Sequence, residues 1–156
     1  MKKLVLLVFL LIISFSKGEE QDVAKIVIDF RSGDLHIFEN YLINGLANNI
    51  QYYRDNLKEL KVVVVVHGDG YKFFIKNLDK SPYKDEVQLK KKQKELKERL
   101  ENLVKFYGVR FEMCKAGMKA RGISEDNIYP FVKPVYSALV GLVNWQNKGY
   151  AYMVFQ

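Results

Sequence analysis

The feature that most constrains the fold of this 156-residue chain is a run of five consecutive valines at residues 62–66. Valine is branched at its β-carbon and favours extended backbone. Because no polar residue alternates with the valines, both faces of this strand must be buried, as in a parallel sheet with helices on both sides. The run stops at His67, Gly68, Asp69 and Gly70, where two glycines favour a tight turn. The run therefore predicts an α/β protein.

The rest of the chain alternates between strand and helix patterns. Further strands are expected at residues 25–30, 109–113, 132–136 and 150–155. Apolar residues at steps of three and four predict helices at residues 34–53, 71–76, 81–107 and 137–147. Asp34, Ser81 and Ser137 are expected to begin three of these helices, and Gly108 to end the longest. Since βαβ units place helices on both faces of a sheet, we expect a three-layer α/β/α domain with a mostly parallel five-stranded sheet.

The first residues have the pattern of a signal peptide. Lys2 and Lys3 precede an apolar stretch at residues 4–15, and small residues follow it. The stretch is shorter than the roughly 20 residues that a membrane helix needs, so no stable membrane insertion is expected after cleavage. An uncleaved N-terminal anchor is the alternative. The sequence thus predicts a signal peptide at residues 1–18, a single domain at residues 19–156, and a periplasmic or secreted location.

The positive charge of the chain does not form a nucleic-acid-binding pattern. The formal net charge is +7, and three of the 25 basic residues lie in the predicted signal peptide. Much of the remaining excess is at residues 90–92, among glutamine and glutamate on a predicted exposed helix face. A nucleic-acid site would instead show a basic stripe with interleaved aromatic residues. We therefore expect no nucleic-acid partner.

Cys114 is the only cysteine of the chain and directly follows the predicted strand at residues 109–113. The turn after it carries Lys115, Lys119 and Arg121. Nearby cations and the positive end of a helix favour the thiolate, which is the nucleophilic form of cysteine. An exported protein with one cysteine cannot form an internal disulfide, which indicates a reactive thiol or pairing between molecules. The alternative is a small buried hydrophobic residue, because free cysteine is often buried.

Polar residues follow three of the predicted strands where each strand ends. The carboxyl ends of parallel strands meet at one edge of a sheet, where ligands and catalytic groups gather. We call the segments expected there the carboxyl edge: residues 31–34, 67–70 and 114–122. Here Ser32 could help present backbone N–H groups to an anion, and His67 could polarise or deprotonate a thiol. His67, Asp69 and Cys114 lack the short spacing of a metal site, so no metal is expected. Thiol chemistry at Cys114 requires no organic cofactor, so none is expected either.

Three segments together resemble the DsrE/DsrF-like family. Residues 62–70 form a hydrophobic strand that ends in His-Gly-x-Gly. Residues 109–114 form the cysteine strand, which is followed at residues 119–123 by Lys-Ala-Arg-Gly-Ile, and residues 149–152 are Gly-Tyr-Ala-Tyr. The resemblance covers nearly the whole chain after the predicted signal peptide. It implies a flavodoxin-like α/β/α fold that assembles as a homotrimer or homohexamer.

The resemblance also implies a function, because members of this family act in sulfur relay and sulfur oxidation. It implies that Cys114 carries sulfur as a persulfide and that His67 lies beside it. The residues expected to surround the persulfide are Lys115, Gly117, Lys119, Arg121, Gly68, Gly70 and Ser32. The protein would then be a sulfur carrier, or sulfurtransferase-like, with a sulfur donor and an acceptor protein thiol as partners.

Two other interpretations stay open at this point. One is a non-catalytic binding or assembly module of the same fold, in which Cys114 is structural. The other is a small sensor of redox state or of zinc or copper. The predicted export is a departure from the best understood relay members, which work in the cytoplasm beside dedicated partners.

Overall fold

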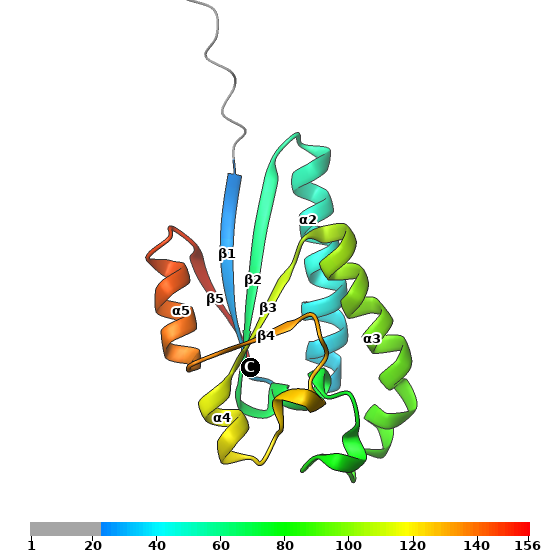
Figure 1. Ribbon diagram of the computed structural model, residues 1–156. Coiled ribbons are helices and arrows are strands. Elements are labelled where there is room, and N and C mark those ends of the chain that lie inside the picture. The colour runs from blue at the N-terminus through cyan, green and yellow to red at the C-terminus, as the bar shows by residue number, and fades with distance from the viewer. Residues whose placement is uncertain (1–22) are drawn as a thin grey trace, which may run out of the picture.

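A parallel five-stranded sheet forms the centre of the computed structural model, which describes residues 23–156 (Figure 1). The strands are β1 (Val23–Phe30), β2 (Glu59–Val66), β3 (Arg110–Cys114), β4 (Val132–Val135) and β5 (Ala151–Phe155). They lie in the order β4-β3-β2-β1-β5, and each neighbouring pair is parallel. The predicted α/β class is confirmed, and the sheet is entirely parallel. The predicted signal peptide at residues 1–18 lies outside the described residues.

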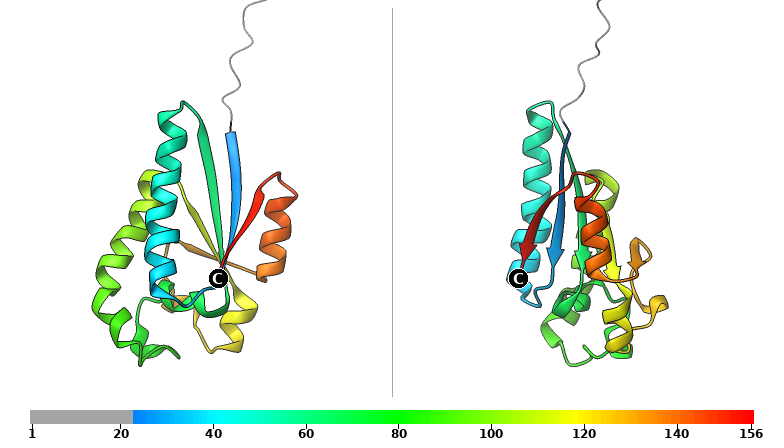
Figure 2. Two further views of the ribbon diagram at one scale, coloured as in Figure 1. Left: turned by 180° about the vertical axis from the view of Figure 1, so that it is seen from behind. Right: turned by 90° about the vertical axis from the view of Figure 1, so that its left-hand side faces the viewer.

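Helices cover both faces of the sheet, as the views of Figure 2 show for α2 and α5 on opposite sides. The longer helical segments are η1 (Ile37–Gly45), α2 (Leu46–Asp55), α3 (Val87–Tyr107), α4 (Lys115–Ala120) and α5 (Ala138–Gln146). Short 3₁₀ turns complete the connections: η2 (Gly68–Phe74), η3 (Leu78–Lys80) and η4 (Glu125–Asn127). Within residues 23–156, no helix combines the length and apolar character needed to cross a bilayer.

The five valines are buried on both faces of β2, as their sequence predicts. All five are at most 3% exposed. Val62, Val64 and Val66 belong to the larger core beneath η1, α2 and α3, whereas Val63 and Val65 pack with Trp145 of α5. Successive strand residues point to opposite faces, so one unbroken apolar run serves two cores.

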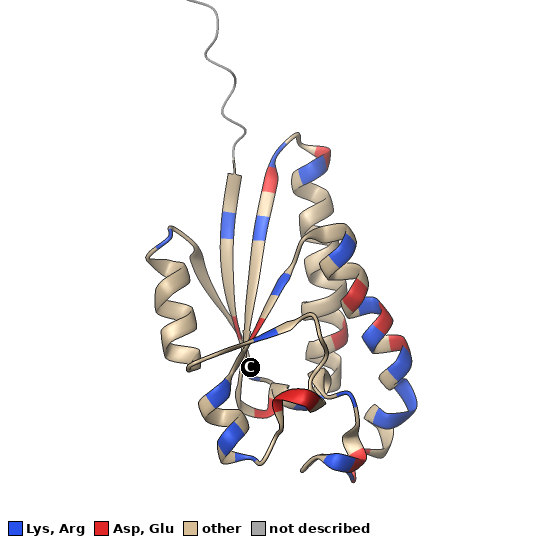
Figure 3. Cartoon of the chain, viewed as in Figure 1, with Lys and Arg blue, Asp and Glu red and all other residues tan. Residues whose placement is uncertain are grey.

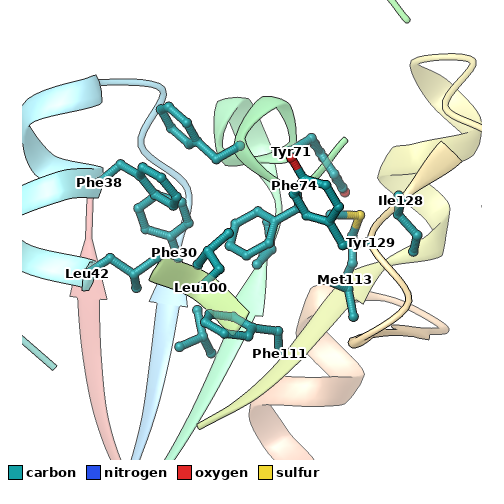
Figure 4. Close-up of a cluster of buried hydrophobic side chains, with 14 of the residues drawn as sticks. Phe30, Phe38, Leu42, Tyr71, Phe74, Leu100, Phe111, Met113, Ile128 and Tyr129 are labelled. Carbon is teal, nitrogen blue, oxygen red and sulfur yellow. The ribbon is translucent and has the colours of Figure 1, made fainter. Parts of the chain in front are cut away.

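Aromatic rings fill the larger core (Figure 4). Phe38 of η1 stacks on Phe73 of η2 with ring centroids 4.1 Å apart. Phe74 contacts Phe30, the last residue of β1, and Phe111 of β3. These rings connect η2 to the sheet, so the segment after His67 is held against the strand ends.

Most predicted helix ends agree with the structure, but the start of the longest helix does not. Asp34 accepts a hydrogen bond from the Ile37 N–H at 2.9 Å, and Ser137 caps α5 as expected. Gly108 ends α3 in the left-handed region, at φ 70°. The prediction that this helix begins at Ser81 is wrong, because the Ser81 hydroxyl accepts from the Tyr83 N–H and closes a local turn instead.

The basic run at residues 90–92 lies on the exposed side of α3, where acidic and basic residues alternate (Figure 3). Lys90 pairs with Asp79, and Lys92 pairs with Glu39 at 2.8 Å. The basic run is therefore part of a solvated helix face with ion pairs.

Leu100 of α3 is completely buried in the larger core. Truncating it in Leu100→Ala removes apolar contacts and leaves a cavity, so we expect unfolding to become easier by about 2–5 kcal/mol. Val87→Ala, on the exposed start of the same helix, should cost less than about 0.5 kcal/mol. Equilibrium denaturation of the two variants measures both values. A loss at Leu100→Ala no larger than at Val87→Ala would contradict the packing of α3.

Candidate functional site

Close backbone approach joins the ends of β1 and β2 at the carboxyl edge. The His67 N–H donates to the Phe30 carbonyl at 3.0 Å. Gly68 has φ 60°, and a β-carbon there would lie 2.9 Å from the Arg31 carbonyl oxygen. At Gly70 a β-carbon would lie 2.9 Å from the Phe30 ring. Glycine is therefore required at both positions, because a side chain there would overlap the residues at the end of β1.

Ser32 is buried at the end of β1, where its hydroxyl accepts from the Asp34 N–H at 3.2 Å. Its neighbour Gly33 packs closely on Asp69, since a β-carbon at Gly33 would lie 2.8 Å from the Asp69 β-carbon. Ser32 thus stabilises the turn that leads into η1. The predicted segments at residues 31–34 and 67–70 lie against each other at the carboxyl edge.

Cys114 is the last residue of β3 and the N-cap residue of α4. Its sulfur accepts a hydrogen bond from the Gly117 N–H at 3.4 Å, and the residue is 7% exposed. Both the N–H donor and the positive end of a helical turn stabilise negative charge on sulfur. The expected position of Cys114, at a strand end before a helical turn, is therefore observed.

Tyr71 is a residue of this site that the sequence analysis missed. Its side chain is completely buried, and its hydroxyl donates to the Cys114 carbonyl at 3.0 Å. Burial raises the pKa of Tyr71, and the neighbouring Cys114 raises this pKa further. A β-carbon at Gly117 would lie 2.0 Å from the Tyr71 hydroxyl oxygen. The absence of a side chain at Gly117 makes room for this phenol.

Two of the three predicted cations have partners within the protein. Lys115 pairs with Glu125 at 2.7 Å. The Arg121 guanidinium carbon lies 5.1 Å from the centre of the Tyr71 ring, and one of its nitrogens is 3.9 Å from an Asp69 carboxylate oxygen. Neither cation is therefore held as a free charge beside the sulfur.

A groove of about 770 Å³ lies along α4, and its lining begins at Lys115, the residue after Cys114. Its lining combines two lysines with apolar side chains: Lys115, Ala116, Met118, Lys119, Ile123, Glu125 and Tyr136. Lys119 is exposed and contributes positive charge to the groove. The groove can admit a molecule that has both an apolar part and an anionic group.

His67 is bonded to a residue that was not predicted as part of the site. Its Nε2 lies 2.5 Å from an oxygen of Asp29, near the end of β1. The other Asp29 oxygen accepts from the Tyr152 hydroxyl of β5 at 2.7 Å. Val66 pairs with Met113 across β2 and β3, so His67 and Cys114 follow on adjacent strands. The His67 ring is thus held by Asp29, while the Cys114 sulfur is bonded to the α4 backbone.

Within the described part of the chain, no three side chains of the His, Cys, Asp and Glu types come together as a metal site would require.

The contact between Tyr71 and Gly117 can be tested by adding one methyl group. We expect Gly117→Ala to destabilise the fold by about 1–3 kcal/mol, because the new β-carbon overlaps the phenol. Adding Tyr71→Phe should recover part of this loss, with a coupling energy of about 0.5–3 kcal/mol in a double-mutant cycle. Gly122→Ala is the control, since its β-carbon meets no atom within 4 Å and only its φ of 66° is unfavourable. Equal effects of Tyr71→Phe on both alanine variants would contradict the contact.

The raised pKa of Tyr71 predicts a specific alkaline sensitivity. A raised pKa in the folded state stabilises the fold below the usual tyrosine value of 10.0, and this stabilisation is lost as pH rises through and beyond that value. Above about pH 10, Tyr71 alone should lower stability by up to about 1.4 kcal/mol per pH unit. Tyr71→Phe should show a correspondingly shallower slope in denaturant unfolding between about pH 9 and about pH 11. Identical slopes for the two proteins would rule out this assignment.

Comparison with known proteins agrees with this architecture. The model of the DsrE/DsrF-like family matches residues 25–155. No curated protein is a significant match. Among solved structures, the protein of unknown function MTH1491 from Methanobacterium thermoautotrophicum is similar, with a TM-score of 0.54 and 23% identity over 84% of this chain and 98% of that chain. This likeness supports the fold. Because the family model spans most of the sequence, the chain belongs to the DsrE/DsrF-like family.

Proposed function

We propose that this protein is an exported sulfur carrier that holds sulfane sulfur as a persulfide on Cys114 and passes it to a partner thiol. Membership of a family often related to sulfur relay supports this function. The observation that carries it is the position of Cys114. The only cysteine of the chain ends β3 at the carboxyl edge, with its sulfur accepting an N–H from the first turn of α4.

The proposed transfer needs no cofactor and no net oxidant. The Cys114 thiolate attacks the outer sulfur of a donor persulfide, the donor's S–S bond breaks, and the donor leaves as a thiolate with the electron pair. Cys114 then carries the outer sulfur as a persulfide. An acceptor thiolate attacks this sulfur in turn, and Cys114 leaves as the regenerated thiolate.

The surrounding residues have distinct roles in this proposal. The Gly117 N–H stabilises the thiolate before loading and after release, in the same way as it now bonds the sulfur. To His67, which follows the adjacent strand β2, we assign the exchange of a proton with the incoming or leaving sulfur. Lys119 supplies positive charge in the groove along α4, where the anionic part of a donor would lie. Lys115 adds positive charge to the wall of this groove. Arg121 acts indirectly, through its contact with the Tyr71 ring.

Location and assembly are part of the same proposal. The N-terminal pattern at residues 1–18 favours export to the periplasm or secretion. Assembly as a homotrimer or homohexamer would cover exposed apolar side chains on and near α5. These are Leu139 and Val143 of the helix and Tyr136 just before it. The partners of the assembled protein would be a sulfur donor and an acceptor protein thiol.

One observation favours a second function, a binding or assembly module in which Cys114 is structural. Cys114 is only 7% exposed and packs within the larger core. A carrier thiol must reach a partner, so this burial requires that α4 yield, or that the donor be a small molecule. A buried structural thiol would react with an alkylating reagent only after denaturation.

Intact-protein mass spectrometry tests the carrier function. We expect the purified protein to gain about one sulfur atom (~32 Da) after exposure to polysulfide or a persulfide donor, and to lose it on reduction. Cys114→Ser, the closest isostere, should gain nothing while keeping the circular dichroism spectrum of the parent. Equal sulfur uptake by Cys114→Ser would exclude Cys114 as the carrier. No uptake by the parent, together with a thiol that resists alkylation, would favour the binding module.

A further inference from the structure

The carboxylate of Asp29 is buried between three strands and has a partner on each oxygen. Its side chain is 7% exposed. One oxygen lies 2.5 Å from Nε2 of His67, which follows β2, and the other accepts from the Tyr152 hydroxyl of β5 at 2.7 Å. The His67 side chain, by contrast, is 26% exposed. The three residues therefore form a chain of contacts in which only the middle member, Asp29, is buried, and His67 ends the chain at the carboxyl edge.

The register of the sheet explains why these side chains meet. Asp29 pairs with Val65 of β2, and Tyr152 of β5 pairs with Val27 of β1. His67 lies two residues beyond Val65, and Asp29 lies two residues beyond Val27. Because residues two apart on a strand share a face, Asp29, His67 and Tyr152 all belong to the face covered by α5. The arrangement is thus built into the sheet and does not depend on a flexible loop.

The bonding requirements of the carboxylate fix the proton on the imidazole. A buried carboxylate needs hydrogen-bond donors on its oxygens. The Tyr152 hydroxyl is one donor. The other must be the N–H at Nε2 of His67, because an ionised carboxylate has no proton to give. The hydrogen bond from Tyr152 to Asp29, with burial and the Asp29 charge as further causes, raises the pKa of Tyr152, so the Tyr152 hydroxyl keeps the proton that it donates.

We infer that Asp29 is a positioning residue for His67: it holds Nε2 in its protonated form and so leaves Nδ1 as the nitrogen available for proton exchange with sulfur at Cys114. This inference rests on the proposed function and deepens it. Neutral His67 can accept a proton through Nδ1, and the carboxylate then stabilises the imidazolium. Asp69, which is close to His67 in sequence, contacts Arg121 instead.

The tautomer of His67 can be measured directly by ¹⁵N NMR of the imidazole rings. The chain has two histidines, and His36→Gln identifies the His67 signals because His36 is exposed and takes no part in the contact between Asp29 and His67. In the parent protein near neutral pH we expect the neutral ring to carry its proton on Nε2. In Asp29→Asn the amide nitrogen can donate to Nε2, so the proton should move to Nδ1.

The same variant should slow the chemistry. We expect sulfur transfer from loaded Cys114 to a small thiol to fall about 10- to 100-fold in Asp29→Asn, which is less than the roughly 10²–10⁴-fold that general acid–base catalysis contributes, because His67 itself remains. His36→Gln is the matched control and should transfer sulfur at the parental rate. Tyr152→Phe removes the hydroxyl donor to Asp29 but keeps the contact between Asp29 and His67. The tautomer of His67 in this variant should therefore be that of the parent.

The two measurements separate this inference from the proposed function. A parent ring protonated at Nδ1 would overturn the inference even if Asp29→Asn does not fold. An Asp29→Asn protein with parental tautomer and transfer rate would overturn it as well. A parent that takes up no sulfur while its tautomer still switches in Asp29→Asn would contradict the proposed function and support the positioning of His67 by Asp29.

Discussion

The site depends on one constraint, the position of β2 at the middle of a sheet that is covered on both faces. Its valines leave no face for water, so β2 needs a central position with cover on both sides, and it lies between β1 and β3 in parallel register with both. These registers bring the ends of the three strands to the same level. The residues that follow them, including His67 and Cys114, therefore come at the ends of adjacent strands. A purely structural requirement, burial of a hydrophobic strand, thus assembles the chemical groups.

A second requirement sets the orientation of Cys114. Tyr71 reaches from η2 across to the junction of β3 and α4 and bonds the Cys114 carbonyl, and the space for its phenol exists only because residue 117 is glycine. The same glycine supplies the N–H that the sulfur accepts. Tyr71 and Gly117 therefore act together, since the phenol fixes the backbone from one side and the N–H holds the sulfur from the other.

The sequence predicts the fold well because its strongest signals are local. The valine run, the cap at Asp34 and the stop at Gly108 each depend on residues close in the chain, and the structure has all three. The site contacts are different, since Asp29 and Tyr152 meet across 123 positions of sequence. The strand expected at residues 25–30 includes Asp29, but no local pattern shows which residue a buried carboxylate will bond. Tyr71 was likewise missed because its partner lies 43 positions away.

The two faces of the sheet differ in polarity. The face under η1, α2 and α3 holds the large aromatic core, whereas both buried carboxylates, Asp29 and Glu112, share the face of Val63 and Val65. Each carboxylate accepts from an aromatic donor, Tyr152 for Asp29 and Trp145 for Glu112. A buried charge with satisfied oxygens adds little net stability compared with apolar packing. Asp29, whose second oxygen contacts His67, is therefore better explained by the proposed role of His67 than by folding.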